Sequence, residues 1–182
     1  MLLMILLAML FAKIRHYKIK SIFLTWTFYP ALVVELVYVF FQINVFLGNY
    51  YFVQFAPFFK TATLYVYLIP MLAYKLYKSG LIGSGLIIIG TMLNKFVMAQ
   101  NGGKMPVYPS LSYITGYAKP DSFTVVGDIH ILGDVNTKWK ILTDYIDIGY
   151  SILSVGDIFI HSFAFIITYS LIKATNEKKE IK

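Results

Sequence analysis

The sequence has no cysteine among its 182 residues. Disulfide bonds, cysteine-ligated metal centres and thiol nucleophiles are therefore excluded. Charge is also scarce, because only 14% of the residues are charged, against roughly 25% in an average soluble domain. With 58% hydrophobic residues and a mean hydropathy of +0.68, the composition is that of an integral membrane protein.

The apolar residues fall in five runs separated by polar or basic segments, of which only residues 101–149 form a long one. Runs of this kind predict an all-α integral membrane protein with about five transmembrane helices in a single membrane domain. The first run, Met1–Ala12, is short for a span, and no small-residue cleavage site follows it, so we expect a retained helix rather than a signal peptide. The predicted spans are residues 1–17, 21–44, 56–74, 81–100 and 150–174.

The basic residues are unevenly distributed between these spans. In a five-span chain one side of the membrane carries ten of the sixteen lysines and arginines, in KIRHYKIK (13–20), KLYK (75–78) and the C-terminal end. By the positive-inside rule this side is cytoplasmic, which puts the N-terminus outside and the tail, residues 175–182, in the cytoplasm. The long connection, residues 101–149, then forms an extracytoplasmic cap between helices four and five, with five of the nine acidic residues.

Glu35 is the deepest acidic residue in the predicted spans. Charged groups within a membrane are costly, so this carboxyl group is expected to be neutral or to face a counter-charge, for which Lys60 and Lys95 are candidates. Two interpretations stay open. Glu35 either holds helices together or takes part in handling an ion or a proton.

Asp157 and His161 are four residues apart at the start of the last predicted span, so they share one face of a helix. Ser154 lies three residues before Asp157, where it can cap the helix N-terminus. Helix capping and an Asp–His pair explain these residues without chemistry. The alternative is a ligand, metal or proton site that opens outward.

The stretch VVGDIH (125–130), followed by TDYIDIG (143–149), has the letters of a metallophosphoesterase, in which carboxylates and imidazoles bridge two metal ions. The connection is too short for the α/β sandwich of such an enzyme, and the later Gly-Asn-His element is missing. A simpler divalent-cation site stays open. Its candidate ligands are Asp128, His130, Asp134, Asp144 and Asp147.

Several short patterns resemble a family of small bacterial membrane proteins known only as a domain of unknown function. They are LN at 93–94, AQNGGKMPV at 99–107 with one residue inserted, and SVGDIFI at 154–160; His130, Thr137 and Asp144 fit the family's loop pattern. The sequence departs from that pattern at Thr143 and Lys140. The resemblance covers about residues 80–165 and implies signature residues that meet on the outer face of a bacterial cytoplasmic (inner) membrane, with no activity attached.

These observations favour a non-enzymatic binding or accessory subunit of a membrane complex, whose cap holds a partner protein, a lipid headgroup or a small solute. The alternatives are a small solute or ion transporter and a membrane enzyme acting on a lipid or phosphate at the outer surface. The expected partners are the lipid bilayer and another membrane protein; no nucleic acid is expected, and neither a cofactor nor a metal is identified. The candidate binding residues are Asn94, Lys95, Asn101, Gly102, Gly103, Met105, Pro106, His130, Asp144, Ser154, Gly156, Asp157 and His161.

Overall fold

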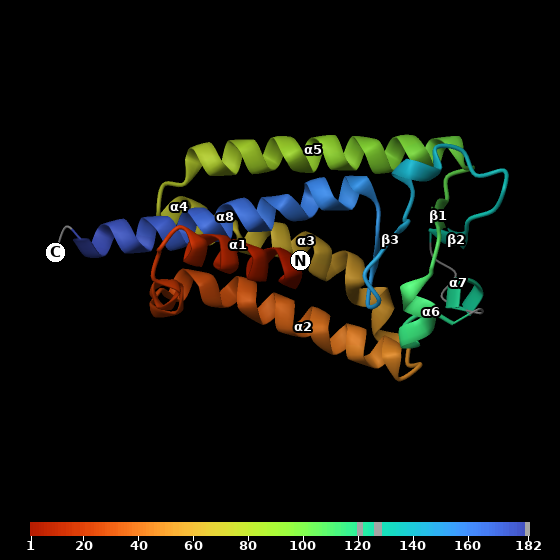
Figure 1. Cartoon of the computed structure of the whole chain (residues 1–182), viewed down its shortest axis with the longest axis horizontal. Helices are drawn as coiled ribbons and strands as arrows, with labels where there is room; N and C mark the ends of the chain where they lie inside the picture. The colour runs from red at the N-terminus through yellow and green to blue at the C-terminus, as the bar shows by residue number, and fades with distance from the viewer. Residues whose placement is uncertain (120–121, 126–128, 181–182) are drawn as a thin grey trace. The chain divides into compact units, whose positions relative to one another are not determined.

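The structure is a computed structural model that describes residues 1–119, 122–125 and 129–180, and Figure 1 shows its helices and strands coloured from red at the N-terminus to blue at the C-terminus. Within these residues, four helical segments are long and apolar enough to cross a membrane. The prediction of an all-α integral membrane protein is therefore confirmed. The four segments are Trp26–Phe46, Tyr51–Ala73, Tyr77–Gln100 and Val155–Glu177.

The first predicted span is a shorter helix than the other four. Helix α1 (Leu2–Ile14) has 13 residues, which corresponds to a length of roughly 20 Å against a hydrocarbon core of roughly 30 Å. Two 3₁₀ turns follow it, η1 (Ile19–Leu24) and η2 (Trp26–Phe28). Among the described residues, four helical segments are thus long enough to span a membrane and one apolar helix is shorter, where five spans were expected.

The second and third spans are built from several pieces. Helix α2 (Tyr29–Phe46) follows directly on η2, and the third span consists of η3 (Tyr51–Phe55), α3 (Ala56–Val66) and α4 (Leu68–Ala73). The break between α3 and α4 has a local cause. Pro70 has no N–H group, and its ring would clash with the carbonyl group of Val66 in a continuous helix.

The chain divides into two compact units. The first unit consists of residues 1–40, 55–86 and 161–182, and the second of residues 41–54 and 87–160. Helix α2, helix α5 (Tyr77–Gln100) and helix α8 (Val155–Glu180) contribute residues to both. Each unit is described by itself below.

The first unit has an apolar core between α1, η1, η2 and the C-terminal half of α8. Its buried residues are Ile5, Ala12, Ile22, Phe28, Leu171 and Ile172. On the same part of α8, the ring of Tyr169 lies 5.2 Å from the ring of Phe11. Helix α5 joins this unit through the hydroxyls of Ser79 and Ser170, 2.7 Å apart, and through Gly83, where a Cβ atom would meet the side chain of Phe163.

The second unit contains the strands and the short helices of the cap. After α5 the chain forms β1 (Met105–Val107), α6 (Leu111–Thr115), α7 (Ser122–Val125) and β2 (His130–Leu132). The turn η4 (Lys140–Leu142), β3 (Ile146–Asp147) and β4 (Ile152–Leu153) complete it. Strands β1 and β2 are parallel, with Met105 opposite His130, while β3 and β4 are antiparallel. The last span was expected to begin at residue 150, but β4 precedes it and α8 begins at Val155.

Candidate functional site

A closed ring of hydrogen bonds joins α5 to the first turn of α8 in the second unit. The hydroxyl of Ser154 accepts from the N–H of Asp157 (2.9 Å), and the carboxylate of Asp157 accepts from the N–H of Ser154 (3.3 Å). This reciprocal pair is a capping box, which satisfies two backbone groups that a helix start leaves open. The Asn94 side chain closes the ring, because its Nδ2 donates to Asp157 (3.0 Å) and its Oδ1 accepts from the Ser154 hydroxyl (2.8 Å).

Two glycines let the helices approach closely enough for this ring to form. A Cβ atom on Gly156 would collide with the Asn94 side chain and lie 2.6 Å from the carbonyl oxygen of Gly90. A Cβ atom on Gly90 would likewise collide with the Gly156 carbonyl oxygen and lie 2.8 Å from a side-chain carbon of Ile160. Each glycine therefore leaves room for the backbone of the other helix.

The end of α5 is fixed by Asn101 and the two glycines that follow it. Gly102 and Gly103 have φ angles of 66° and 81°, and the N–H of Gly103 donates to the carbonyl oxygen of Met98 (2.8 Å). This left-handed turn ends the helix. The Asn101 side chain then pairs with the backbone of Lys138 like a peptide group, donating to its carbonyl oxygen (3.0 Å) and accepting from its N–H (2.9 Å).

The residues Met105–Val107 form the central strand of the cap. On one side β1 pairs with β2, and the N–H of Met105 donates to the carbonyl oxygen of Ile129 (2.8 Å). On the other side the N–H of Asp144 donates to the carbonyl oxygen of Pro106 (3.1 Å). The side chains of Met105 and Val107 are buried. Met105 and Val107 thus pack inside the cap instead of facing an open site.

His130 and Asp144 lie together across this strand. The Nε2 atom of His130 is 3.4 Å from a carboxylate oxygen of Asp144, whose side chain is buried while the imidazole is partly exposed. Such a pair can fix the orientation of the imidazole. Within the described residues no three His, Asp or Glu side chains are grouped as a metal site would require, and Asp128 lies outside those residues.

The carboxylate of Asp147 is held by four donors. It accepts from the N–H groups of Ser110 (2.7 Å), Ser112 (2.8 Å) and Gly149 (2.8 Å), and from the Ser112 hydroxyl (2.5 Å). Burial by itself would raise the pKa of Asp147, but these hydrogen bonds outweigh it and hold the pKa below its ordinary value. This carboxylate fixes the start of α6.

Acid is expected to loosen α6 through Asp147. Because the folded-state pKa is lowered, the carboxylate stabilises the fold above its ordinary pKa of 3.8, and this contribution is lost as the pH falls through the folded-state value. Asp147→Asn should lose about 2 kcal/mol of unfolding free energy at neutral pH and remove this part of the acid dependence. Hydrogen exchange of α6 between neutral pH and pH 3 measures both effects.

Asp134→Asn is the matched control for this experiment. The Asp134 carboxylate accepts from the N–H of Asn136 (2.9 Å) and the hydroxyl of Thr137 (3.3 Å) on an exposed turn. Asp134→Asn should leave the hydrogen exchange of the α6 amides unchanged. Equal protection of α6 in the wild type and in Asp147→Asn would contradict the role given to Asp147.

Three of the predicted residues lie elsewhere. Lys95 is exposed on α5. His161 belongs to the first unit, as does Glu35, whose side chain is 1% exposed. The amino group of Met1 lies 3.8 Å from a carboxylate oxygen of Glu35, a counter-charge that the sequence did not suggest.

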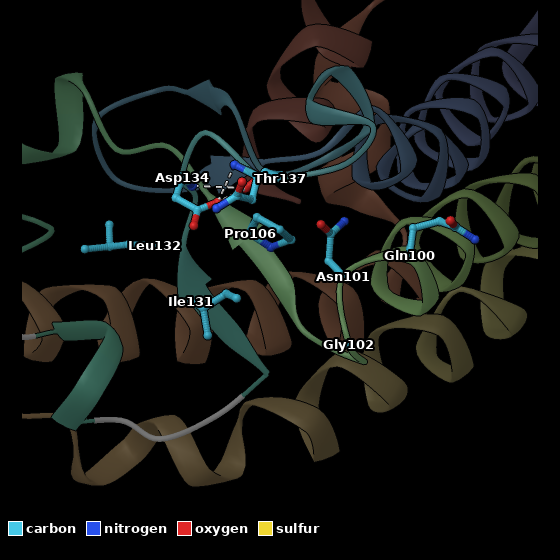
Figure 2. A pocket seen from close by; sticks show the side chains of 9 residues that line it. Gln100, Asn101, Gly102, Pro106, Ile131, Leu132, Asp134 and Thr137 are labelled. Carbon is cyan, nitrogen blue, oxygen red and sulfur yellow. Dashed lines mark hydrogen bonds between the residues drawn. The ribbon is translucent and has the colours of Figure 1, made fainter.

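A shallow hollow of about 300 Å³ lies on the second unit, beside the two hydrogen bonds that join the Asn101 side chain to the backbone of Lys138. Figure 2 shows its lining: Gln100 and Asn101 from the end of α5, Pro106 from β1, Ile131 and Leu132 from β2, and Asp134 and Thr137 from the following turn. Sequence reasoning missed Gln100, Ile131, Leu132 and Asn136 as lining residues. The turn residues DVNT (134–137) are the signal that could have indicated this rim, because Asp, Asn and Thr side chains stabilise tight turns.

Comparison with protein families gives one match, which covers residues 18–169. No curated protein and no solved structure matched the chain. The matched residues include all four long apolar helices except the C-terminal end of α8, together with the whole cap. The chain therefore belongs to a family of unknown function, DUF5317.

Proposed function

We propose that this protein is a non-enzymatic accessory subunit of a complex in a bacterial cytoplasmic membrane. Its cap lies outside and its C-terminus lies in the cytoplasm, in keeping with the distribution of basic residues. The cap is the surface that another membrane protein binds. Transport and lipid-directed catalysis stay as alternatives from the sequence, and no arrangement among the described residues favours either of them.

The hollow and its apolar flank are the observation that supports this proposal. Ile131 and Leu132 line the hollow and are exposed, and Val135 at the tip of the adjacent turn is 98% exposed. These three residues form the apolar flank. A partner would cover these apolar groups, while the amides of Gln100 and Asn136 offer hydrogen bonds at the rim. Neither amide bonds to another described residue.

The surrounding polar residues support a rigid binding surface rather than a reaction centre. Asn94, Ser154 and Asp157 bond to one another, and Asn101 bonds to the backbone of Lys138. These side chains therefore hold α5, α8 and the 134–138 turn in place. A docking surface benefits from such a frame, because less conformational freedom is lost on binding.

Cysteine labelling tests the proposal directly, because the chain has no cysteine of its own. Val135→Cys should react slowly with a membrane-impermeant maleimide in intact spheroplasts and rapidly after purification in detergent, since the partner is then removed. Ile114→Cys is the matched control, because Ile114 is 83% exposed on α6 in the same unit. It should react rapidly in both conditions.

The other outcomes separate the parts of the proposal. Equal, rapid labelling of both cysteines in spheroplasts would show that no partner covers Val135, which would contradict the proposed binding surface. Labelling of both only after the membrane is opened would contradict the orientation. Protection of Val135→Cys that persists in nanodiscs containing the purified protein and lipid alone would assign the flank to lipid instead of a protein.

A further inference from the structure

The segment Lys138–Ile141 displays large apolar side chains between two lysines. Trp139 is 56% exposed and Ile141 is 65% exposed, and the side chains of Lys138 and Lys140 are exposed as well. Tryptophan and lysine next to each other are typical of the membrane–water interface, where the ring lies among headgroups and the ammonium group faces phosphates. The hollow described above does not include these four residues.

Trp139 lies beside the C-terminal end of α5, at a level that agrees with such an interface. Its ring lies 5.4 Å from the ring of Phe96, at an interplanar angle of 65°, and Phe96 is itself exposed on α5. Ile88, Ile89 and Met92 on the same helix are exposed as well, so this part of α5 presents apolar side chains that lipid can cover. Phe96 is four residues before the end of the helix, roughly 6 Å along its axis. The headgroup layer is about 5–8 Å deep, so a helix that ends at the outer edge of this layer would place Trp139 within it.

Trp139 is held in this place by its surroundings. Its φ angle is 56°, a left-handed conformation that is uncommon for an aromatic residue. The Asn101 side chain fixes the backbone of Lys138 on one side. On the other side, the ammonium group of Lys140 lies 4.2 Å from the centre of the Tyr108 ring. The segment is therefore a constrained turn.

We propose that Lys138–Ile141 is an interfacial anchor that binds the headgroup layer of an anionic bilayer. Trp139 and Ile141 enter the layer beside Phe96, and Lys138 and Lys140 face lipid phosphates. Charge complementarity identifies the lipid class, because basic residues at a membrane surface attract anionic headgroups. The anchor holds the cap at a fixed height above the membrane and does not depend on a protein partner.

The depth of Trp139 can be measured in the full-length protein. The chain has two tryptophans, so Trp26→Phe leaves Trp139 as the only reporter. In nanodiscs, lipid brominated near the headgroup end of its acyl chains should quench most of this emission, and acrylamide should quench little. The control adds Trp139→Phe and Val135→Trp, which moves the reporter to the exposed tip and should reverse both results. Equal acrylamide quenching of the two reporters would overturn the anchor.

Lipid retention tests the role of the lysines. After mild purification, native mass spectrometry should show several-fold less bound phosphatidylglycerol for the double variant Lys138→Gln, Lys140→Gln than for the wild type. Lys119→Gln, which removes an exposed lysine from another part of the same unit, should retain as much as the wild type. The bonds from Asn101 use only the backbone of residue 138, so the double variant keeps them, but Lys140→Gln removes the contact with Tyr108. Tyr108→Leu removes the same contact and keeps both lysines, so it should retain as much lipid as the wild type. Retention equal to the wild type in the double variant would overturn the lipid assignment.

Discussion

Replacing Gly156 by alanine is expected to destabilise the second unit by about 3 kcal/mol, the upper part of the range for overpacked sites. The added methyl group would collide with the Asn94 side chain and lie 2.6 Å from a backbone carbonyl oxygen of α5, which cannot turn away as a side chain can. Gly90→Ala should behave in the same way, because its methyl group would collide with the backbone of α8. Reversible unfolding in mixed micelles, followed by circular dichroism, measures the loss.

Gly85→Ala provides the matched control on the same helix as Gly90. A Cβ atom at Gly85 would have nothing within 4 Å, and alanine favours a helix more than glycine does. We therefore expect this variant to unfold within about 0.5 kcal/mol of the wild type or to be more stable. Similar losses at Gly85 and Gly90 would show that the close approach of α5 and α8 does not limit stability.

The second large effect is expected at Asn94. Asn94→Ala removes one donor and one acceptor from the ring, which leaves the Ser154 hydroxyl and the Asp157 carboxylate each with fewer partners. The expected loss is about 2–3 kcal/mol of unfolding free energy. Asn94→Asp should cost more, because it places a second carboxylate beside Asp157.

Exchanging the Asn94 amide and the Asp157 carboxylate tests whether the ring of hydrogen bonds is the source of the stability. In the double variant Asn94→Asp, Asp157→Asn, the new carboxylate can accept from the Ser154 hydroxyl and from the new amide. The new amide oxygen can in turn accept from the N–H of Ser154. Most of the loss caused by Asn94→Asp should therefore be recovered, apart from the smaller favourable effect of a carboxylate at a helix N-terminus. An exchange variant no more stable than Asn94→Asp would contradict the ring as the source of the effect.

The membrane fold was predictable because hydropathy acts over whole helices. Long apolar runs and scarce charge predict spans without any knowledge of their neighbours, and the four long apolar segments were found by this signal. The capping of α8 was also predictable, because Ser154 and Asp157 are three residues apart and the capping box is a local pattern.

The arrangement of the cap was less predictable, because its contacts join distant residues through side chain and backbone. Asn101 bonds to the backbone of Lys138, and Asp147 bonds to the start of α6; a backbone partner leaves no trace in residue type. Asp147 was a metal-ligand candidate by its charge, whereas in the structure it fixes α6. The hollow is formed by residues from four segments, and no periodic pattern links them.

The Asn94 ring also has a consequence for synthesis of the chain. Asn94 and Asp157 are 63 residues apart, and a chain made from the N-terminus completes α5 well before the first turn of α8 exists. During this interval the Asn94 amide lacks both of its partners in a helix made mainly of apolar residues. The part of α5 around Asn94 is then incompletely stabilised until α8 is made, and chains that terminate before Ser154 should be preferred substrates for membrane proteases.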